Sequence, residues 1–323
     1  MRLPETMKGV MFVEKGKAAL QQEPTPELAA GQVLCKTIYT GLTNGTERNF
    51  LCGGNYGGHS WPARLGYQNV GEVLEVSEGV EGFAPGEIVF SGDVCNHVEY
   101  FAAPAGLGAL IVKLPDEVDL KDAALFGVAS VAMHDVQRAE ILLGERVLVV
   151  GAGLIGQFTA QAARLAGADV TIVDLNEKRL LIAQKLGAGK TVRVTGLESW
   201  REAAEEGRFD VVFEDSGAPV LDHIIGVGWG DGIVKARARI VMIAGRERVD
   251  YAFNAAQARE LTILHAGHFV ADDLRLVTRL VAEGSLSISP TIQEVVRIDD
   301  CIAIYDSLRD DPGMLLGTVF DWQ

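Results

Sequence analysis

The chain has 323 residues, of which 48% are hydrophobic and 7% aromatic, a composition that suits two globular domains and excludes a disordered or fibrous protein. Its formal net charge of −15 argues against nucleic acid and anionic membrane surfaces as partners, because both attract positive charge. No apolar run reaches the ~20 residues of a membrane-spanning helix, so we expect no membrane segment.

The first third of the chain predicts a β-rich domain. From residue 9 to about residue 115, short β-like runs such as GVMFVEKG, QVLCKTIYTG and ALIVKLP are separated by turn residues. This spacing is typical of a compact antiparallel barrel or sandwich.

The pattern changes near Asp119, after which helix-like and strand-like stretches alternate. Residues 120–143 read as one helix, and 272–284 as a later amphipathic helix. The apolar strands between them are RVLVVG (146–151), VTIVD (170–174), TVRV (191–194), DVVFEDSG (210–217), RIVMIAG (239–245) and LTILHAG (261–267). Repeated β-α units of this length predict a doubly wound parallel sheet with helices on both faces.

The tail ISPTIQEVVRIDDCIAIYDSL returns to a mixed pattern, and we expect it to rejoin the first domain. The predicted organisation is therefore a β-rich domain formed by residues 1–124 and 289–323, interrupted by the domain of the doubly wound sheet over 125–288.

Three glycines in GxGxxG spacing follow the first of these strands and open a helix: Gly151, Gly153 and Gly156. In such a loop the first glycine permits the tight turn, the second lets a pyrophosphate approach, and the third lets the helix pack against the strand. The N–H groups at the start of the helix, which begins with Leu154 and Ile155, then face the phosphates. We therefore predict a Rossmann-type dinucleotide site.

Asp174 ends the next strand. A carboxylate there accepts hydrogen bonds from the adenosine ribose and repels a 2′-phosphate, which favours NAD over NADP as the cofactor. Arg179 is a mild opposite signal, because a nearby arginine can serve NADP, but beside Lys178 on a helix it is more often a solvated charge. Gly245, at the end of the fifth strand, is a further predicted cofactor contact.

The amino-terminal residues MRLPETMKGV lack the basic-then-apolar pattern of a secretion signal. The cysteines are scattered, without a CxxC pair: Cys35, Cys52, Cys95 and Cys301. Scattered cysteines are typical of reduced thiols, so we expect a cytoplasmic protein.

A barrel-like domain, an inserted dinucleotide fold and a returning tail resemble the medium-chain dehydrogenase/reductase superfamily over nearly the whole chain. The resemblance rests on GAGLIG with Asp174, on GEIVF, on AALFGVASVAMHDV and on PTIQEVVRIDDCIAIYDSL. It implies a GroES-like β-barrel catalytic domain, a six-stranded Rossmann domain and a homodimer. Locally, GTER (45–48) and LGYQNVGEV are similar to the zinc-lacking group typified by bacteriochlorophyllide hydroxyethyl dehydrogenase.

In zinc-containing members of this superfamily a cysteine, a histidine and an acidic residue or cysteine hold the catalytic metal. The resemblance matches these positions to Asn44, Tyr67 and Gly127, and none supplies a thiolate, an imidazole or a carboxylate. Gln68 stands where the adjacent glutamate would be. A second, structural zinc needs four close cysteines, and the segment 89–101 holds only one. We therefore expect no zinc.

Without zinc, hydride transfer needs another group to bind the substrate oxygen and to carry its proton. Tyr67 is a candidate, since a phenol can donate to a ketone and accept the proton back if its pKa is lowered; alternatively it caps a glycine turn. Glu47, in the place of the family's motif aspartate, could act as a base, or pair with Arg48 or Arg64 on a loop. Thr46 matches the family's relay hydroxyl.

Further polar side chains are candidate substrate contacts. Asn44 and Gln68 could bind a polyhydroxy substrate, or fill the emptied metal pocket with satisfied amides. His59 lies on a glycine-rich loop of the kind that lines clefts, and His268 follows the last strand of the parallel sheet. His97 lies in the segment 89–101, which is too short to carry the four-cysteine zinc lobe, and is expected at the surface.

These features predict a zinc-independent, NAD-dependent oxidoreductase for a small-molecule secondary alcohol or ketone of sugar, cyclitol or polyol type. Two alternatives stay open. One is reduction of an activated C=C bond in an enone or quinone, although such enzymes usually prefer NADPH and carry a more glycine-rich loop. The other is a non-catalytic scaffold that binds a dinucleotide.

Overall fold

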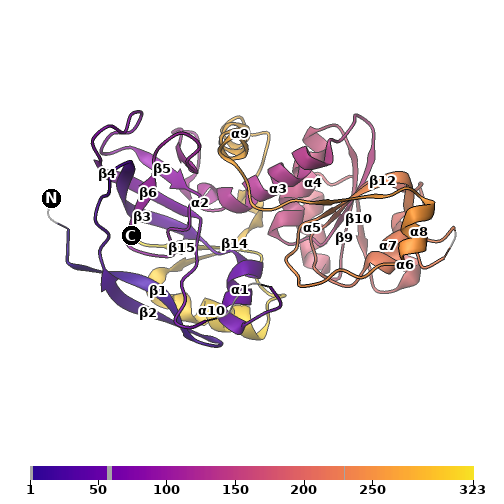
Figure 1. Cartoon of the computed structure of the whole chain (residues 1–323), viewed down its shortest axis with the longest axis horizontal. Coiled ribbons are helices and arrows are strands. Elements are labelled where there is room, and N and C mark those ends of the chain that lie inside the picture. The colour runs from indigo at the N-terminus through magenta and orange to yellow at the C-terminus, as the bar shows by residue number, and fades with distance from the viewer. Residues whose placement is uncertain (1–2, 57–59, 229) are drawn as a thin grey trace. The chain divides into compact units, whose positions relative to one another are not determined.

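The computed structural model describes residues 3–56, 60–228 and 230–323, and the chain divides into two compact units (Figure 1). The first unit comprises Met1–Gly127, Val270–Gly284 and Ile292–Gln323, and the second comprises Val128–Phe269 and Ser285–Thr291. Within the described ranges, no helix combines the length and the apolar character needed to cross a membrane.

The first unit is built on a largely antiparallel sheet. Its strand order is β14-β15-β3-β4-β5-β7, with β6 paired to β3, and only the β14–β15 pair is parallel. A separate hairpin joins β1 to β2. The bounds are β1 (Thr6–Glu14), β2 (Lys17–Pro24), β3 (Gln32–Gly41), β4 (Asn69–Val76), β5 (Ile88–Ser91), β6 (Tyr100–Pro104), β7 (Ile111–Lys113), β14 (Ile292–Arg297) and β15 (Gly317–Asp321).

Helix α1 (Asn44–Cys52) packs against α10 (Cys301–Asp310), although 248 residues lie between them in the chain (Figure 1). Between them and the strands lies an apolar core that includes Leu42, Leu51 and Phe320, all fully buried. Burying one such side chain stabilises the fold by about 1.5–3 kcal/mol. This core holds the first turn of α1 in a fixed place beside the sheet.

Three further helices differ in part from the sequence expectation. The predicted helix 120–143 is two helices, α2 (Leu120–Ala123) and α3 (Phe126–Ala139), and α3 ends where Glu140 takes a left-handed φ of 51°. Helix α9 (Ala271–Ala282) was placed in the nucleotide-binding domain but belongs to the first unit, because it packs against β7.

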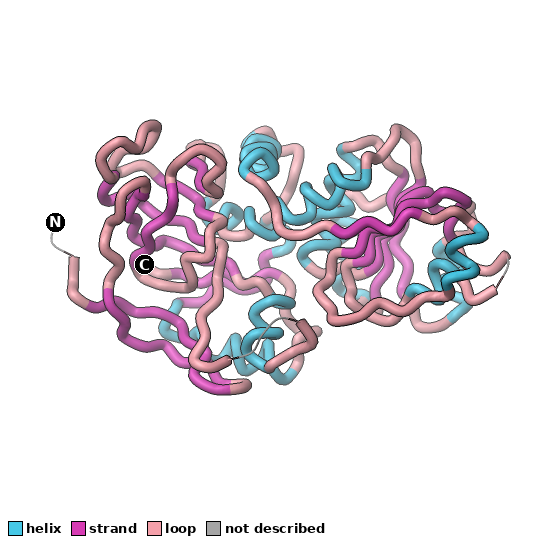
Figure 2. Tube along the Cα trace, viewed as in Figure 1, coloured by secondary structure: helices cyan, strands magenta, loops and turns pink. Residues whose placement is uncertain are grey.

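The second unit is a parallel sheet with the order β10-β9-β8-β11-β12-β13, seen as magenta strands in Figure 2. The chain builds this sheet outward from β8, first toward β10 and then toward β13, so the strand order reverses between β8 and β11. Ligands of such sheets bind at the carboxyl ends of the strands beside that point. The strands are β8 (Arg146–Val150), β9 (Asp169–Asp174), β10 (Lys190–Arg193), β11 (Phe209–Glu214), β12 (Val234–Met242) and β13 (Thr262–His265).

Helical segments connect these strands: α4 (Leu154–Leu165), α5 (Glu177–Lys185), α6 (Leu197–Ala203), α7 (Leu221–Ile225) and α8 (Phe253–Ala258). Short 3-10 turns are η1 (Ser289–Thr291), in this unit, and η2 (Ile298–Asp300), in the first. The doubly wound parallel sheet predicted from the sequence is confirmed.

Candidate functional site

The glycine-rich loop of the second unit lies between β8 and α4, and its three glycines differ in what a side chain would meet there. Gly151 has a left-handed φ of 102°. A Cβ on Gly156 would lie 1.8 Å from the carbonyl oxygen of Gly151, so only glycine lets the helix approach the loop this closely. A Cβ on Gly153 would meet no protein atom within 4 Å, which leaves its backbone open to a ligand.

Asp174 lies against this loop. One oxygen of its carboxylate accepts a hydrogen bond from the backbone N–H of Ala152 (2.6 Å), and the other accepts one from Asn176 (2.7 Å). The carboxylate is thereby fixed where β9 ends. The other predicted cofactor residues are Leu154 and Ile155 at the start of α4, the half-buried Arg179 on α5, and the exposed Gly245 just after β12.

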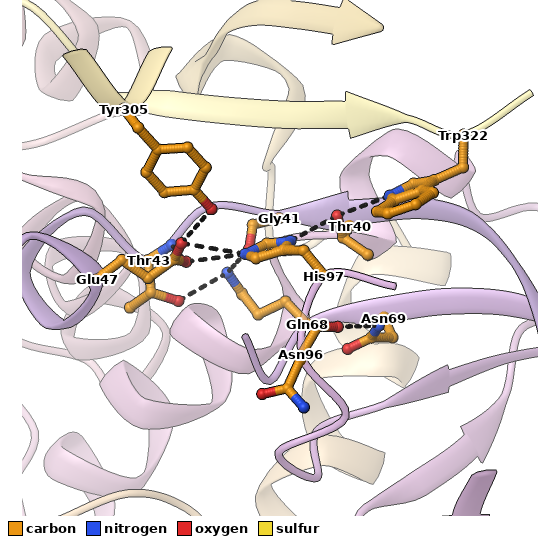
Figure 3. A network of polar contacts seen from close by, with 10 residues as sticks. All are labelled: Thr40, Gly41, Thr43, Glu47, Gln68, Asn69, Asn96, His97, Tyr305 and Trp322. Atoms are coloured by element: carbon orange, nitrogen blue, oxygen red, sulfur yellow. Dashed lines mark hydrogen bonds and ion pairs between the residues drawn. The ribbon is translucent and has the colours of Figure 1, made fainter. Parts of the chain in front are cut away.

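In the first unit, Glu47 on α1 is the centre of a buried polar network (Figure 3). One carboxylate oxygen accepts the backbone N–H of Thr43 (2.7 Å) and the other accepts the hydroxyl of Tyr305 (2.7 Å). The Nε2 atom of His97 lies 3.1 Å from both oxygens. The expectation that Glu47 forms an ion pair on a loop is wrong, because its side chain is fully buried on α1. Arg64, one of the two expected partners, pairs with Glu23 instead.

His97 extends the network toward the last strand. Its Nδ1 atom lies 2.7 Å from the hydroxyl of Thr40, which also accepts the indole N–H of Trp322 (3.0 Å) (Figure 3). The expectation that His97 lies at the surface is wrong, since only 1% of its surface is exposed. The sequence did not indicate the role of His97 in this network, nor those of its other members Thr40, Thr43, Tyr305 and Trp322.

Tyr67 and Gln68 approach the same network from the start of β4. The Gln68 amide donates to the carbonyl of Gly41 (3.2 Å) and to the hydroxyl of Thr43 (3.3 Å). Burial raises the pKa of Tyr67 to about 12, a hydrogen bond with the Thr43 hydroxyl opposes this increase, and the charge of Glu47 adds to it. Tyr67 could accept a proton at neutral pH only if its pKa were lowered, and its pKa is raised instead. The phenol therefore stays protonated at neutral pH.

Asn44 begins α1, and its amide nitrogen donates to two backbone carbonyls, Leu315 (3.2 Å) and Leu316 (3.0 Å). These two acceptors fix which end of the amide is nitrogen. Its Oδ1 atom is buried and has no hydrogen-bond partner among the described residues. A buried acceptor without a donor costs about 1–3 kcal/mol, so Asn44 is suited to accept a hydrogen bond from a ligand.

Other predicted residues lie outside these networks or outside the description. Thr46 is half-buried on α1, next to Glu47. Asn49, also on α1, donates to the carbonyl of Tyr56. His268 is exposed, with its ring stacked on Phe269. His59 lies outside the described residues.

Of the three positions matched to zinc ligands, Gly127 and Tyr67 lie next to each other. A Cβ on Gly127 would lie 3.0 Å from the Tyr67 ring and 2.9 Å from Gln68, so these side chains fill the space that a larger residue would need. Zinc sites use thiolate, imidazole or carboxylate ligands. An amide, a protonated phenol and a glycine do not fit zinc.

Comparison with known proteins finds two family models that match this chain and relatives that are similar over most of its length. The model of the alcohol dehydrogenase GroES-like domain matches residues 29–113, and the model of the zinc-binding dehydrogenase family matches residues 155–283. A 2-dehydro-3-deoxy-L-galactonate 5-dehydrogenase from Pseudoalteromonas atlantica is 29% identical, over 88% of this chain and 89% of its own. A probable D-xylulose reductase from Arthroderma otae is 28% identical, over 95% and 96%.

Solved structures share the fold. A short chain alcohol dehydrogenase from E. coli, solved in complex with NADH, superposes with a TM-score of 0.85 at 18% identity, over 99% of this chain and 100% of that one. The two domain models match in chain order and the relatives match over nearly the whole chain, and both findings support the resemblance to the medium-chain dehydrogenase/reductase superfamily.

Proposed function

We propose that the protein is an NAD(H)-dependent oxidoreductase that works without zinc and interconverts a secondary alcohol and a ketone on a sugar, cyclitol or polyol. The observation that carries the proposal is the pairing of an intact nucleotide loop, backed by Asp174, with a site where Asn44, Tyr67 and Gly127 leave no zinc ligand. The relatives named as sugar-acid dehydrogenase and xylulose reductase support the substrate class.

The residues of the second unit fit a dinucleotide. The open backbone at Gly153 and the first N–H groups of α4 suit a pyrophosphate, and the Asp174 carboxylate suits the ribose hydroxyls. A 2′-phosphate would face the same negative charge, which favours NAD over NADP. When bound, the nicotinamide gives a hydride to the ketone carbon or takes one from the alcohol carbon.

The residues of the first unit supply the polar chemistry. In the reductive direction Tyr67 holds a proton at its phenol oxygen and donates it to the ketone oxygen, and the Thr43 hydroxyl then stabilises the tyrosinate. Asn44 Oδ1 accepts a hydrogen bond from a neighbouring substrate hydroxyl, which favours polyhydroxy over simple ketones. Because its phenol is protonated at neutral pH, Tyr67 is in the form that the reductive direction requires.

The test combines substrate profiling with metal analysis. Purified protein is expected to oxidise NADH in the presence of ketoses or inososes, with activity unchanged by a strong chelator and with zinc well below one ion per chain. Stoichiometric zinc whose removal abolishes activity would overturn zinc independence. Hydride transfer from NADPH to an enone or quinone, with no ketose reduced, would support the C=C reductase instead.

Two glycine variants test the nucleotide site. Gly156→Ala places a Cβ against backbone 1.8 Å away, so we expect it to lose NADH binding and about 1–3 kcal/mol of unfolding free energy. The methyl group of Gly153→Ala would contact no protein atom, so the variant should fold normally. The same methyl group would fill space that the pyrophosphate needs, so NADH should bind more weakly. Calorimetric titration with NADH and thermal unfolding separate the two effects. Wild-type NADH affinity in Gly153→Ala would refute this placement of the cofactor.

A further inference from the structure

His97 is a buried imidazole to which the proposed chemistry assigns no task. Its ring packs edge-on against Phe320, with 5.3 Å between the ring centroids. The ring of His97 also leaves little room for a side chain at Gly66, because a Cβ there would lie 3.0 Å from Cδ2 of His97. The turn before it is fixed as well, because the carbonyl of Asn96 accepts the Asn69 amide (2.7 Å) (Figure 3). Both ring nitrogens therefore have a fixed direction.

The hydrogen-bond inventory determines which nitrogen donates. The indole nitrogen of Trp322 can only donate, so it occupies a lone pair of the Thr40 hydroxyl oxygen (3.0 Å). The Glu47 carboxylate at Nε2 of His97 can only accept, so the ring proton belongs on Nε2, and Nδ1 accepts the proton of the Thr40 hydroxyl (2.7 Å). The ring proton lies on Nε2, between the two oxygens of the Glu47 carboxylate (each 3.1 Å). Every donor in this chain points toward Glu47.

From Glu47 the contacts continue to the phenol. The Oε1 atom of Glu47 accepts the Thr43 N–H (2.7 Å), which fixes Thr43 at the start of α1. The Thr43 hydroxyl accepts the Gln68 amide (3.3 Å) and is hydrogen-bonded to Tyr67. A displacement of the Glu47 carboxylate is therefore transmitted to Thr43 and from there to Tyr67.

We propose that His97 is a positioning residue: it holds the Glu47 carboxylate against Thr43, and Thr43 in turn holds the phenol of Tyr67 in the orientation that the reaction needs. The proposal rests on the proposed function for the role of Tyr67. Tyr305 is the second side-chain donor to the same carboxylate. The titratable groups that face Tyr67 are Glu47 and Tyr56, and the charge of Glu47 adds to the increase that burial causes in the phenol's pKa.

Two substitutions test the two ring nitrogens of His97 separately. In His97→Gln the amide reaches the position of Nε2 and can still donate to Glu47, whereas in His97→Asn it reaches only the position of Nδ1, beside Thr40. We expect His97→Gln to keep kcat for ketone reduction near the wild-type value. We expect His97→Asn to lose roughly 10- to 100-fold in kcat, because a misplacement of about 1 Å can cost about 10²-fold.

Two further readouts separate positioning from folding. The KM for NADH should not change in either variant. Hydrogen exchange of the Thr43 amide, which needs no turnover, should be faster in His97→Asn and unchanged in His97→Gln. Equal loss of kcat in both variants, or losses that follow the melting temperature, would overturn the proposal.

The exchange measurement also keeps this proposal distinct from the proposed function. If wild-type protein reduces no ketone, the proposed function fails, while Thr43 exchange still decides whether His97 fixes Glu47. If His97→Asn does not fold, Thr40→Val serves in its place, because it removes the hydroxyl that holds the His97 ring at Nδ1. Wild-type kcat and exchange in a folded Thr40→Val would then overturn the positioning role.

Discussion

Replacing Tyr67 with phenylalanine is expected to lower kcat for ketone reduction by roughly 10²- to 10⁴-fold, the usual contribution of a general acid. The variant keeps the buried ring and removes only the phenol oxygen, so the fold should tolerate it. The rate of NADH oxidation at saturating ketone measures the loss.

Tyr56→Phe is the matched control, because it removes a phenol that interacts with Tyr67 electrostatically without removing the proton donor. Its kcat should stay close to the wild-type value. If Tyr67→Phe also turns over normally, another group donates the proton and the role given to Tyr67 is wrong.

The pH profile gives an independent check on Tyr67. The protonated phenol is the active form, and its pKa is raised to about 12 by burial, so the donor is fully present below that pH and is lost only as the pH rises through it. Reduction should therefore show no loss from Tyr67 across the neutral and mildly alkaline range. A decline centred on the ordinary tyrosine pKa of about 10 would contradict the buried position of the phenol.

The second large effect is expected at Asp174. Asp174→Ala removes the acceptor of the Ala152 N–H and the carboxylate proposed to bind the ribose hydroxyls, so NADH should bind roughly 10- to 100-fold more weakly. Asp174→Asn keeps the shape and removes the charge, so it should narrow the preference for NADH over NADPH. Titration calorimetry with both cofactors measures each change.

Asp169→Ala is the control for this experiment, because Asp169 begins the same strand at the opposite end from Asp174. It should leave the affinity for both cofactors unchanged. Wild-type NADH affinity in Asp174→Ala would mean that the carboxylate fixes the loop and does not contact the ribose.

The parallel sheet could be predicted from the sequence because its signals are local. Each strand is a continuous apolar run, and glycine spacing and the acidic strand end mark the loop between β8 and α4. The placement of α9 was missed for the opposite reason. An amphipathic helix shows which of its faces is apolar, but not which sheet that face will cover.

The network around Glu47 could not be predicted, because it depends on pairings between distant segments. His97 comes just before β6, which pairs antiparallel with β3, and the register of Lys36 with Tyr100 brings His97 close to Thr40. Nothing in the segment VFSGDVCNHVEYF records that register. For Glu47 a local signal did exist: the buried Leu51 lies four residues later on α1, which places both on the inward face of the helix.

The contact of Gly127 with Tyr67 and Gln68 constrains how this chain can evolve. A carboxylate or thiolate introduced at Gly127 would meet both side chains at about 3 Å, and Gln68 cannot simply turn away, because its amide is bound to Gly41 and Thr43. A mutational path to a metal-binding descendant therefore has to shorten Tyr67 or Gln68 before residue 127 can change. The order of substitutions is imposed by sterics, and the first step on that path removes the proposed proton donor or its neighbour before any metal ligand is gained.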